Sequence, residues 1–138
     1  MLDGNAPNTE KMHLIPAVSN NGDGASFFSV REVPLHGTLE RMLSDQQSAM
    51  NFRWRESDAS YASGFHVAGD PTLLVILSGT LCIELHNGEA RHFSVGEYFI
   101  AEDYLRDDAI FDETIHGHRA YVLEGKPLSA LHLKLAKR

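Results

Sequence analysis

The sequence of 138 residues contains one cysteine, one tryptophan and no long run of apolar residues. The single cysteine, Cys82, cannot form an internal disulfide, which is typical of a protein from a reducing compartment. The longest aliphatic stretch, Leu73–Leu77, has the length of a strand and falls far short of the roughly 20 apolar residues of a membrane span. The first residues, M-L-D-G-N, lack the apolar stretch of a secretory signal. We therefore expect a cytoplasmic protein with no membrane partner.

Basic residues are also scarce. The chain has 12 Lys and Arg against 19 Asp and Glu, a formal net charge of −7, and no cluster of basic residues along the sequence. A protein that binds nucleic acid needs a basic face to meet the phosphates. The composition therefore argues against a nucleic-acid partner and favours a small molecule.

Long helical patterns are absent, and short strand patterns take their place. Met50, Phe52 and Trp54 alternate with polar residues, which places three apolar side chains on one face of a strand and makes Trp54 most simply a core aromatic. Asn87-Gly88 separates two alternating segments and is a strong hairpin signal, because both residues adopt positive φ readily. About eight short strands between turn residues predict an all-β sandwich or barrel. They include a central strand at Leu73–Leu77, a strand at Ile115–Leu123 and a last strand at Leu128–Leu135.

The chain divides into two regions by composition. Residues 1–24 are rich in Asn, Gly, Pro and Asp and predict an irregular N-terminal arm, in which one short strand around His13–Val18 is the alternative to a fully irregular segment. Residues 25–138 have the length of one domain. Within them, the long acidic and aperiodic segment Tyr104–Thr114 is a candidate lid, because loops of this length in compact domains are often functional.

Three histidines and Asp103 form the candidate site. His116 and His118 stand two apart on a predicted strand, so their imidazoles are expected on one face about 7 Å apart. His66 lies on another predicted strand between the small residues Gly64 and Ala68. Three histidines together suit one divalent transition metal ion such as zinc, iron, manganese or nickel. No pattern for an organic cofactor is evident.

A plainer interpretation stands beside this one. An H-x-H pair can be two solvated residues on an edge strand, and a histidine beside glycine can be a core residue bonded to the backbone. The remaining histidines are interpreted as surface or turn residues: His13, His36, His86, His92 and His132.

From about Arg53 to Leu135 the sequence resembles the cupin superfamily of small jelly-roll β-barrels. The first cupin motif has the form G-x5-H-x-H-x3-4-E-x6-G, and His66 and Gly79 have the spacing of its first His and last Gly. Ala68 and Thr72 stand where that motif has its second His and its Glu, so two of its metal ligands are missing.

The match is better to a group of short bacterial and fungal cupins with W-H-x-A-P in the first motif. Their second motif resembles F-x-P-G-D-x-x-x-x-E-D-x-x-G-x-G-H. The matching segments occur in the same order here, although the segment before Gly117 is about nine residues longer: Phe65–Ala68, Phe93–Glu97, Glu102-Asp103 and Gly117-His118.

The resemblance implies a barrel of about eight to ten antiparallel strands with a small-molecule site at its mouth. In such a barrel His66, Asp103 and His118 would point inward, with His116 near them. The candidate wall residues, which periodicity alone also places in the core or in a dimer contact, are Trp54, Phe99 and Tyr121. The resemblance also implies a homodimer formed through an edge strand and an N-terminal segment.

Two functions follow from this site. In the first, the protein is an enzyme on a small oxygenated substrate, with His66, Asp103 and His118 as catalytic residues. A metal held by His66, His116 and His118 would polarise a carbonyl or activate oxygen or water. Without a metal, a histidine oriented by Asp103 acts as a general base in an isomerase, dehydratase or cyclase. The absence of metal ligands at Ala68 and Thr72 favours this metal-free version. The alternative is a non-catalytic module that binds a small molecule.

Overall fold

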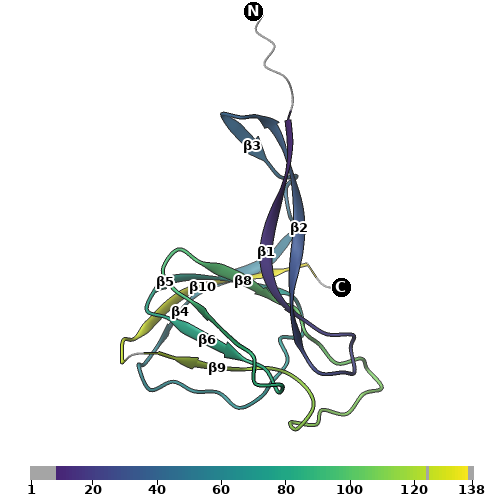
Figure 1. The fold of residues 1–138 in the computed structure, drawn as a ribbon, viewed down its shortest axis with the longest axis vertical. Helices are drawn as coiled ribbons and strands as arrows, with labels where there is room; N and C mark the ends of the chain where they lie inside the picture. The colour runs from purple at the N-terminus through teal and green to yellow at the C-terminus, as the bar shows by residue number, and fades with distance from the viewer. Residues whose placement is uncertain (1–8, 124, 137–138) are drawn as a thin grey trace, which may run out of the picture.

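The computed structural model describes residues 9–123 and 125–136, and these residues form an all-β structure without a helix (Figure 1). Accordingly, no helix in this part of the chain is long and apolar enough to cross a membrane. The described residues contain ten strands: β1 (Thr9–Ser19), β2 (Phe27–Thr38), β3 (Arg41–Leu43), β4 (Ala49–Ser57), β5 (Thr72–Ser78), β6 (Leu81–Glu84), β7 (Ala90–Phe93), β8 (Tyr98–Ala101), β9 (Arg119–Val122) and β10 (Leu128–Leu135).

The strands form two sheets. The larger sheet has seven strands in the order β3-β2-β1-β8-β5-β10-β4, and the smaller sheet has three in the order β7-β6-β9. Neighbouring strands run antiparallel except for the short parallel pairing of β1 with β8. The predicted all-β class is therefore confirmed.

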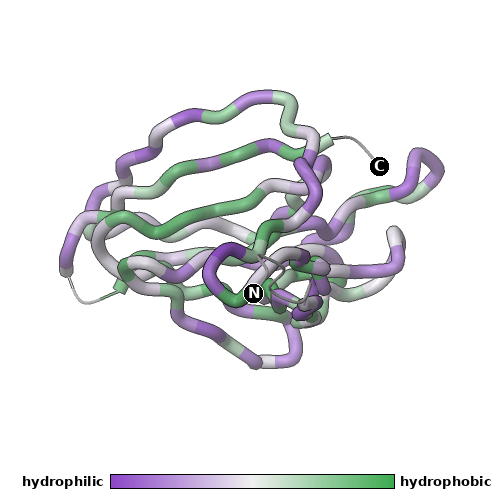
Figure 2. Tube along the Cα trace, turned by 90° about the horizontal axis from the view of Figure 1, so that it is seen from above, coloured by the Kyte–Doolittle hydropathy of each residue, from purple (hydrophilic) through white to green (hydrophobic). Residues whose placement is uncertain are grey.

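Both sheets contribute to one hydrophobic core. Leu74, Ile76 and Phe99 of the larger sheet belong to the same buried cluster as Leu81 and Ile83 of the smaller one. The alternation of strand side chains sends every second residue of β5, β6 and β8 toward this layer. In Figure 2 the hydrophobic stretches lie in the middle strands of the body, and many connecting turns are hydrophilic.

The hairpin predicted at Asn87-Gly88 is confirmed. It joins β6 to β7, which pair antiparallel in the smaller sheet. Gly88 has φ 90°, and its amide donates to the carbonyl oxygen of Leu85 at 3.1 Å. Glycine adopts this backbone conformation without steric cost, which explains why the hairpin turns here.

The N-terminal segment contains a strand that is longer than the short one expected around His13–Val18, so Thr9–Ser19 is not an irregular arm. This segment is β1, which pairs with β2 along its whole length. Ala17 and Val18 also pair with β8, so this end of the hairpin belongs to the body. The other end of the β1–β2 hairpin extends away from the body, with β3 beside it (Figure 1). Pro16 within the segment weakens the strand signal in the sequence. Residues 1–8 lie outside the described residues.

The prediction that Trp54, on β4, is a core aromatic is also wrong. Met50, Phe52 and Trp54 do share one face, but they are 45%, 64% and 69% exposed. Arg53 and Arg55, on the opposite face of this edge strand, line the space between the sheets. Apolar and polar residues therefore alternate along β4 as predicted, but the arginines are on the side of the space between the sheets and the apolar residues face outward.

Candidate functional site

The centre of the candidate site is the buried carboxylate of Asp103, which follows β8 and is 0% exposed. His118 donates its Nδ1–H to Oδ2 of Asp103 at 2.7 Å, and the hydroxyl of Ser26 donates to the same oxygen at 2.7 Å. The amide of Ala68 donates to Oδ1 at 3.0 Å. Burial by itself raises the pKa of Asp103, but these hydrogen bonds and the nearby His118 ring outweigh burial and lower that pKa below its ordinary value.

His118 is held by its backbone as well as by its ring. Its amide and carbonyl exchange two hydrogen bonds of 2.9 Å with those of His66, across an isolated antiparallel bridge. The two imidazole rings lie 4.6 Å apart, centroid to centroid. His118 is buried at 4% exposure, whereas His66 is exposed. Since Asp103 occupies Nδ1 of His118, the nitrogen left for a ligand is Nε2.

Gly117 permits the close approach of the two segments that carry His66 and His118. Its φ is 86°, and a Cβ built at this position would overlap the backbone carbonyl and amide of His66. A residue with a side chain would therefore push apart the two segments that carry His66 and His118.

Both histidines line a cavity of about 310 Å³ between the two sheets, here called the inter-sheet cavity. Its walls include apolar residues from both sheets, among them Leu74, Ile83 and Phe99. Phe99, a predicted wall residue, is thus in this position and is 1% exposed. The other described residues that line the cavity are Arg53, Arg55, Tyr61, Val67, Ala68, Thr72, Leu81, Ala101, Ala120, His132 and Lys134.

The two other predicted wall residues do not line this cavity. Trp54 is 69% exposed and borders an open groove that shares Arg53, Arg55 and His66 with the cavity. Tyr121 is in the smaller sheet, opposite the buried Cys82 on β6. The hydrogen bond between these two side chains raises the pKa of Tyr121 above its ordinary value.

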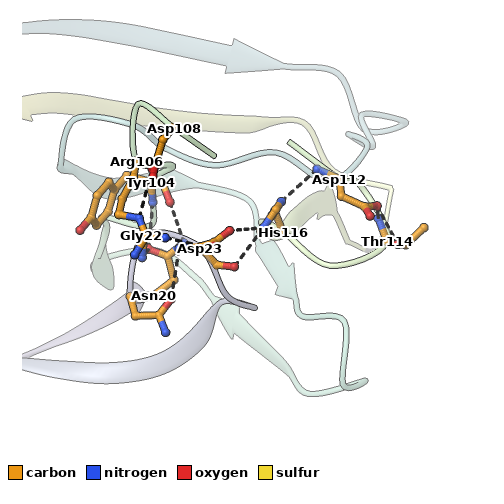
Figure 3. A network of polar contacts seen from close by, with 10 residues as sticks. Asn20, Gly22, Asp23, Tyr104, Arg106, Asp108, Asp112, Thr114 and His116 are labelled. Carbon is orange, nitrogen blue, oxygen red and sulfur yellow. Dashed lines mark hydrogen bonds and ion pairs between the residues drawn. The ribbon is translucent and has the colours of Figure 1, made fainter. Parts of the chain in front are cut away.

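His116 is part of a different network, shown in Figure 3. Its Nδ1 accepts a hydrogen bond from the amide of Asp112 at 2.9 Å, and its Nε2–H donates to the carbonyl oxygen of Asp23 at 3.2 Å. His116 is buried at 3% exposure, and it does not line the inter-sheet cavity. The strand that the sequence predicts over Ile115–Leu123 is confined to Arg119–Val122, so His116 and His118 do not share a strand face.

The Tyr104–Thr114 loop is tied to the turn between β1 and β2 (Figure 3). Asn20 bonds the backbone of Tyr104 with both its amide nitrogen and its amide oxygen, and Arg106 forms an ion pair with Asp23 at 3.1 Å. No residue of this loop lines the inter-sheet cavity, so the structure does not place the predicted lid over it. The loop and the turn instead hold the segments that carry Ser26, Asp103 and His118.

The residues present do not fit the divalent metal ion that the sequence pattern predicts. Both ring nitrogens of His116 are taken by backbone groups, and both oxygens of Asp103 accept hydrogen bonds. Over residues 9–123 and 125–136, no three His, Cys, Asp or Glu side chains lie together in a way that could hold a metal ion. His66 and His118 alone fall short of the usual three protein ligands.

Sequence reasoning missed several polar residues of the site. Ser26 follows a turn and carries no signal of its own. His132 is interpreted from the sequence as a surface residue, yet it lines the cavity, and its Nε2 is buried without a hydrogen-bond partner among the described residues. Arg53, Arg55 and Lys134 alternate with apolar residues on β4 and β10, and that alternation was the only available signal.

No protein-family model matches this chain, and no curated protein matches it significantly. Several solved structures resemble its fold, among them the following two. The conserved SPY1581 protein of unknown function from Streptococcus pyogenes is 16% identical, with a TM-score of 0.47 over 70% of this chain and 71% of that protein. Protein NMB1881 from Neisseria meningitidis is also 16% identical, with a TM-score of 0.43 over 66% of this chain and 84% of that one. Similarity at this level carries no argument about what this chain does.

Proposed function

We propose that this protein is a small-molecule enzyme whose active site is the inter-sheet cavity and whose general base is His118. The observation that carries the proposal is the hydrogen bond of 2.7 Å between Nδ1 of His118 and the buried carboxylate of Asp103. A carboxylate in this position fixes the imidazole tautomer and stabilises the imidazolium that forms when the ring takes up a proton. Asp103 therefore acts as a positioning residue for His118.

In this proposal, Nε2 of His118 removes a proton from a carbon or hydroxyl group of the substrate. The imidazolium that results is paired with Asp103 and is enclosed by the cavity. The proton returns from His118 to another atom of the substrate. If His66, whose ring is 4.6 Å away, donates a proton of its own instead, His118 releases the proton it took to solvent and His66 takes one up from solvent. Each proton taken is given back, so the chemistry is that of an isomerase, a dehydratase or a cyclase.

The resemblance of the sequence to short cupins is consistent with this proposal. Two facing sheets with a cavity between them are an architecture in which such a site is formed, and His66, Asp103 and His118 are the residues that the motifs assign to it. We extend the proposal to a cupin-type jelly roll for the body of the protein. The single buried cysteine keeps the cytoplasm as the proposed compartment.

We also propose a homodimer. Phe52 and Trp54 expose 64% and 69% of their surfaces on β4, which is an edge strand of the larger sheet. An open edge with exposed apolar side chains is a site for pairing with another chain. A second copy of the chain can cover this edge, because β4 of one copy can pair antiparallel with β4 of the other across a two-fold axis.

Solvent exchange tests the enzymatic proposal. Wild-type protein is incubated in D₂O with a panel of small carbonyl and hydroxy compounds, and proton NMR follows loss of C–H signals or formation of products. We expect at least one compound to exchange or convert, and His118→Asn to slow this by about 10²–10⁴-fold. His92→Asn, which changes an exposed histidine, is the matched control.

Two results would overturn the proposal. One is conversion at the same rate by wild type and His118→Asn. The other is binding of compounds in the cavity without any exchange or conversion across the panel, which would identify the protein as a non-catalytic binding module instead.

A further inference from the structure

Basic side chains gather in the inter-sheet cavity of an otherwise acidic protein. The chain has a net charge of −7, yet the cavity lining includes Arg53, Arg55 and Lys134, and no Asp or Glu is among the described residues that line it. No ion pair between described residues involves these three. Other arginines of the chain do pair with carboxylates: Arg31, Arg106 and Arg119.

The strand register brings these basic groups together. Arg53 on β4 stands opposite His132 on β10, which stands opposite Leu74 on β5. Lys134, two residues further along β10, has Thr72 as its partner on β5. Residues paired across neighbouring strands share a face of the sheet, so the cations of β4 and β10 converge on one wall of the cavity.

Arg55 is held in place without losing its charge. Its Nε donates to the hydroxyl of Ser57 at 2.9 Å, and its guanidinium lies 4.7 Å from the centroid of the Tyr61 ring. These contacts are neutral, so the positive charge of Arg55 remains uncompensated beside the cavity. Contacts of this kind orient a guanidinium before a ligand arrives and reduce the entropy lost on binding.

His132 adds a polar atom without a partner. Its Nε2 is buried and makes no hydrogen bond with the described residues. Burial and the charges of Arg55 and Arg53 lower the pKa of His132 to about 4, so the ring is neutral near pH 7 and can carry its proton on Nε2. A buried polar atom left unpaired is costly, and a ligand with an acceptor atom at this position would remove that cost.

We infer that the cavity binds the carboxylate group of a small organic acid, held by the guanidinium groups of Arg53 and Arg55 and hydrogen-bonded by His132. The planar fork of arginine matches a carboxylate with two parallel hydrogen bonds. Apolar residues such as Leu74 and Phe99 form the remaining walls, so the body of the acid is small and largely apolar. This inference names the substrate class of the proposed enzyme and rests on that proposed function.

Calorimetric titration of the full chain tests the inference. The probes are sodium acetate, butanoate and benzoate, each beside its neutral amide, in low-salt buffer at pH 7. We expect at least one carboxylate to bind and its amide to bind at least about tenfold more weakly, since the amide lacks the charge that the guanidinium groups recognise. Arg53→Gln and Arg55→Gln should each weaken carboxylate binding by about 10–100-fold.

Two further variants separate charge from folding defects. Arg53→Lys keeps the charge without the planar fork, and we expect it to bind more tightly than Arg53→Gln and more weakly than wild type. Arg41→Gln changes an exposed arginine on β3 and should bind as wild type does. Thermal unfolding of each variant shows whether it is folded. Equal binding of acids and amides, binding of no probe, unchanged binding by both glutamine variants, or preferential binding of inorganic phosphate would overturn the inference.

The inference and the proposed function fail in different ways. Carboxylates that bind through Arg53 and Arg55 but are never converted would contradict the enzyme and support the inference. Conversion of neutral compounds alone, unaffected by Arg53→Gln, would support the enzyme and contradict the inference.

Discussion

Replacing Asp103 with asparagine tests how the site holds His118. Asparagine has the shape of aspartate, so its Oδ1 can still accept the hydrogen bond of 3.0 Å from the amide of Ala68. At the position of Oδ2, an NH₂ group replaces an oxygen that accepts from both Ser26 and His118 at 2.7 Å. The hydroxyl of Ser26 can rotate and accept instead. His118 can accept only if its proton moves from Nδ1 to Nε2.

The expected loss of stability follows from these bonds. Two charge-assisted hydrogen bonds, worth about 1.5–3 kcal/mol each, become neutral ones worth about 0.5–1.5 kcal/mol. We therefore expect Asp103→Asn to lower the free energy of unfolding by about 2 kcal/mol at pH 7 while the protein stays folded. The change of tautomer places a proton on Nε2, the nitrogen that must be free to act as a base, so the proposed activity should fall by about 10²-fold or more.

The pH dependence supplies a second, independent check. Since the pKa of Asp103 is lowered in the folded protein, its stabilising effect is complete above the unfolded pKa of about 3.9 and is lost as the pH falls through the folded pKa. The difference between wild type and Asp103→Asn should thus be largest above about pH 5 and should shrink below about pH 4.

Urea denaturation between pH 3 and 7 measures the stability difference, and ¹⁵N NMR of the imidazole rings reports the tautomer of His118. Asp107→Asn, which changes an exposed aspartate of the neighbouring loop, is the control and should match wild type. A His118 ring that keeps its Nδ1 proton in Asp103→Asn, or a stability difference that does not vary with pH, would refute this account of the site.

Three further predictions address other features of the molecule. Gly117→Ala should destabilise the protein by about 1–3 kcal/mol more than Gly88→Ala in urea unfolding, because both glycines have positive φ but only Gly117 faces the backbone of His66; equal losses would contradict the close packing. The stability of wild type should fall as the pH drops from about 6.5 toward 4, since the unfolded state then takes up a proton that burial and the charges of Arg55 and Arg53 deny to His132; His132→Gln should flatten this dependence and His92→Gln should not. In sedimentation velocity wild type should be a dimer and Trp54→Glu a monomer, whereas Val95→Glu, which changes an exposed apolar residue outside β4, should stay dimeric; a monomeric wild type would exclude the proposed interface.

Local signals in the sequence predicted much of the strand framework. The Asn87-Gly88 turn, the central strand at Leu73–Leu77 and the last strand at Leu128–Leu135 each depend on short-range pattern and turn chemistry, and the structure has all three. Asp103 and His118 were identified as site residues through motif order, and the structure joins them by a hydrogen bond. The turn and the strand patterns are encoded within a few neighbouring residues, which is why they can be recognised without the fold.

The error over His116 has a local physical cause. Two residues spaced by one share a face only if the backbone between them is extended. Gly117 has φ 86°, which breaks that geometry and turns the ring of His116 toward Asp23 and Asp112. The sequence does contain the glycine, but nothing in a local pattern shows whether it takes a positive φ at that position.

The error over β4 has a cause that lies outside the chain segment itself. Alternation shows that a strand has an apolar and a polar face, but it does not show which face is enclosed. On β4 the polar phase, with Arg53 and Arg55, faces the inter-sheet cavity, and the apolar phase, with Phe52 and Trp54, faces outward. Arg53 is exposed and Arg55 is half-buried, so solvent reaches both cations, and an anion that joins them relieves their mutual repulsion. Exposing large apolar side chains is unfavourable unless another surface covers them. The inverted orientation of this one strand therefore supports both proposals at once: an anionic ligand on its inner face and a second copy of the chain on its outer face.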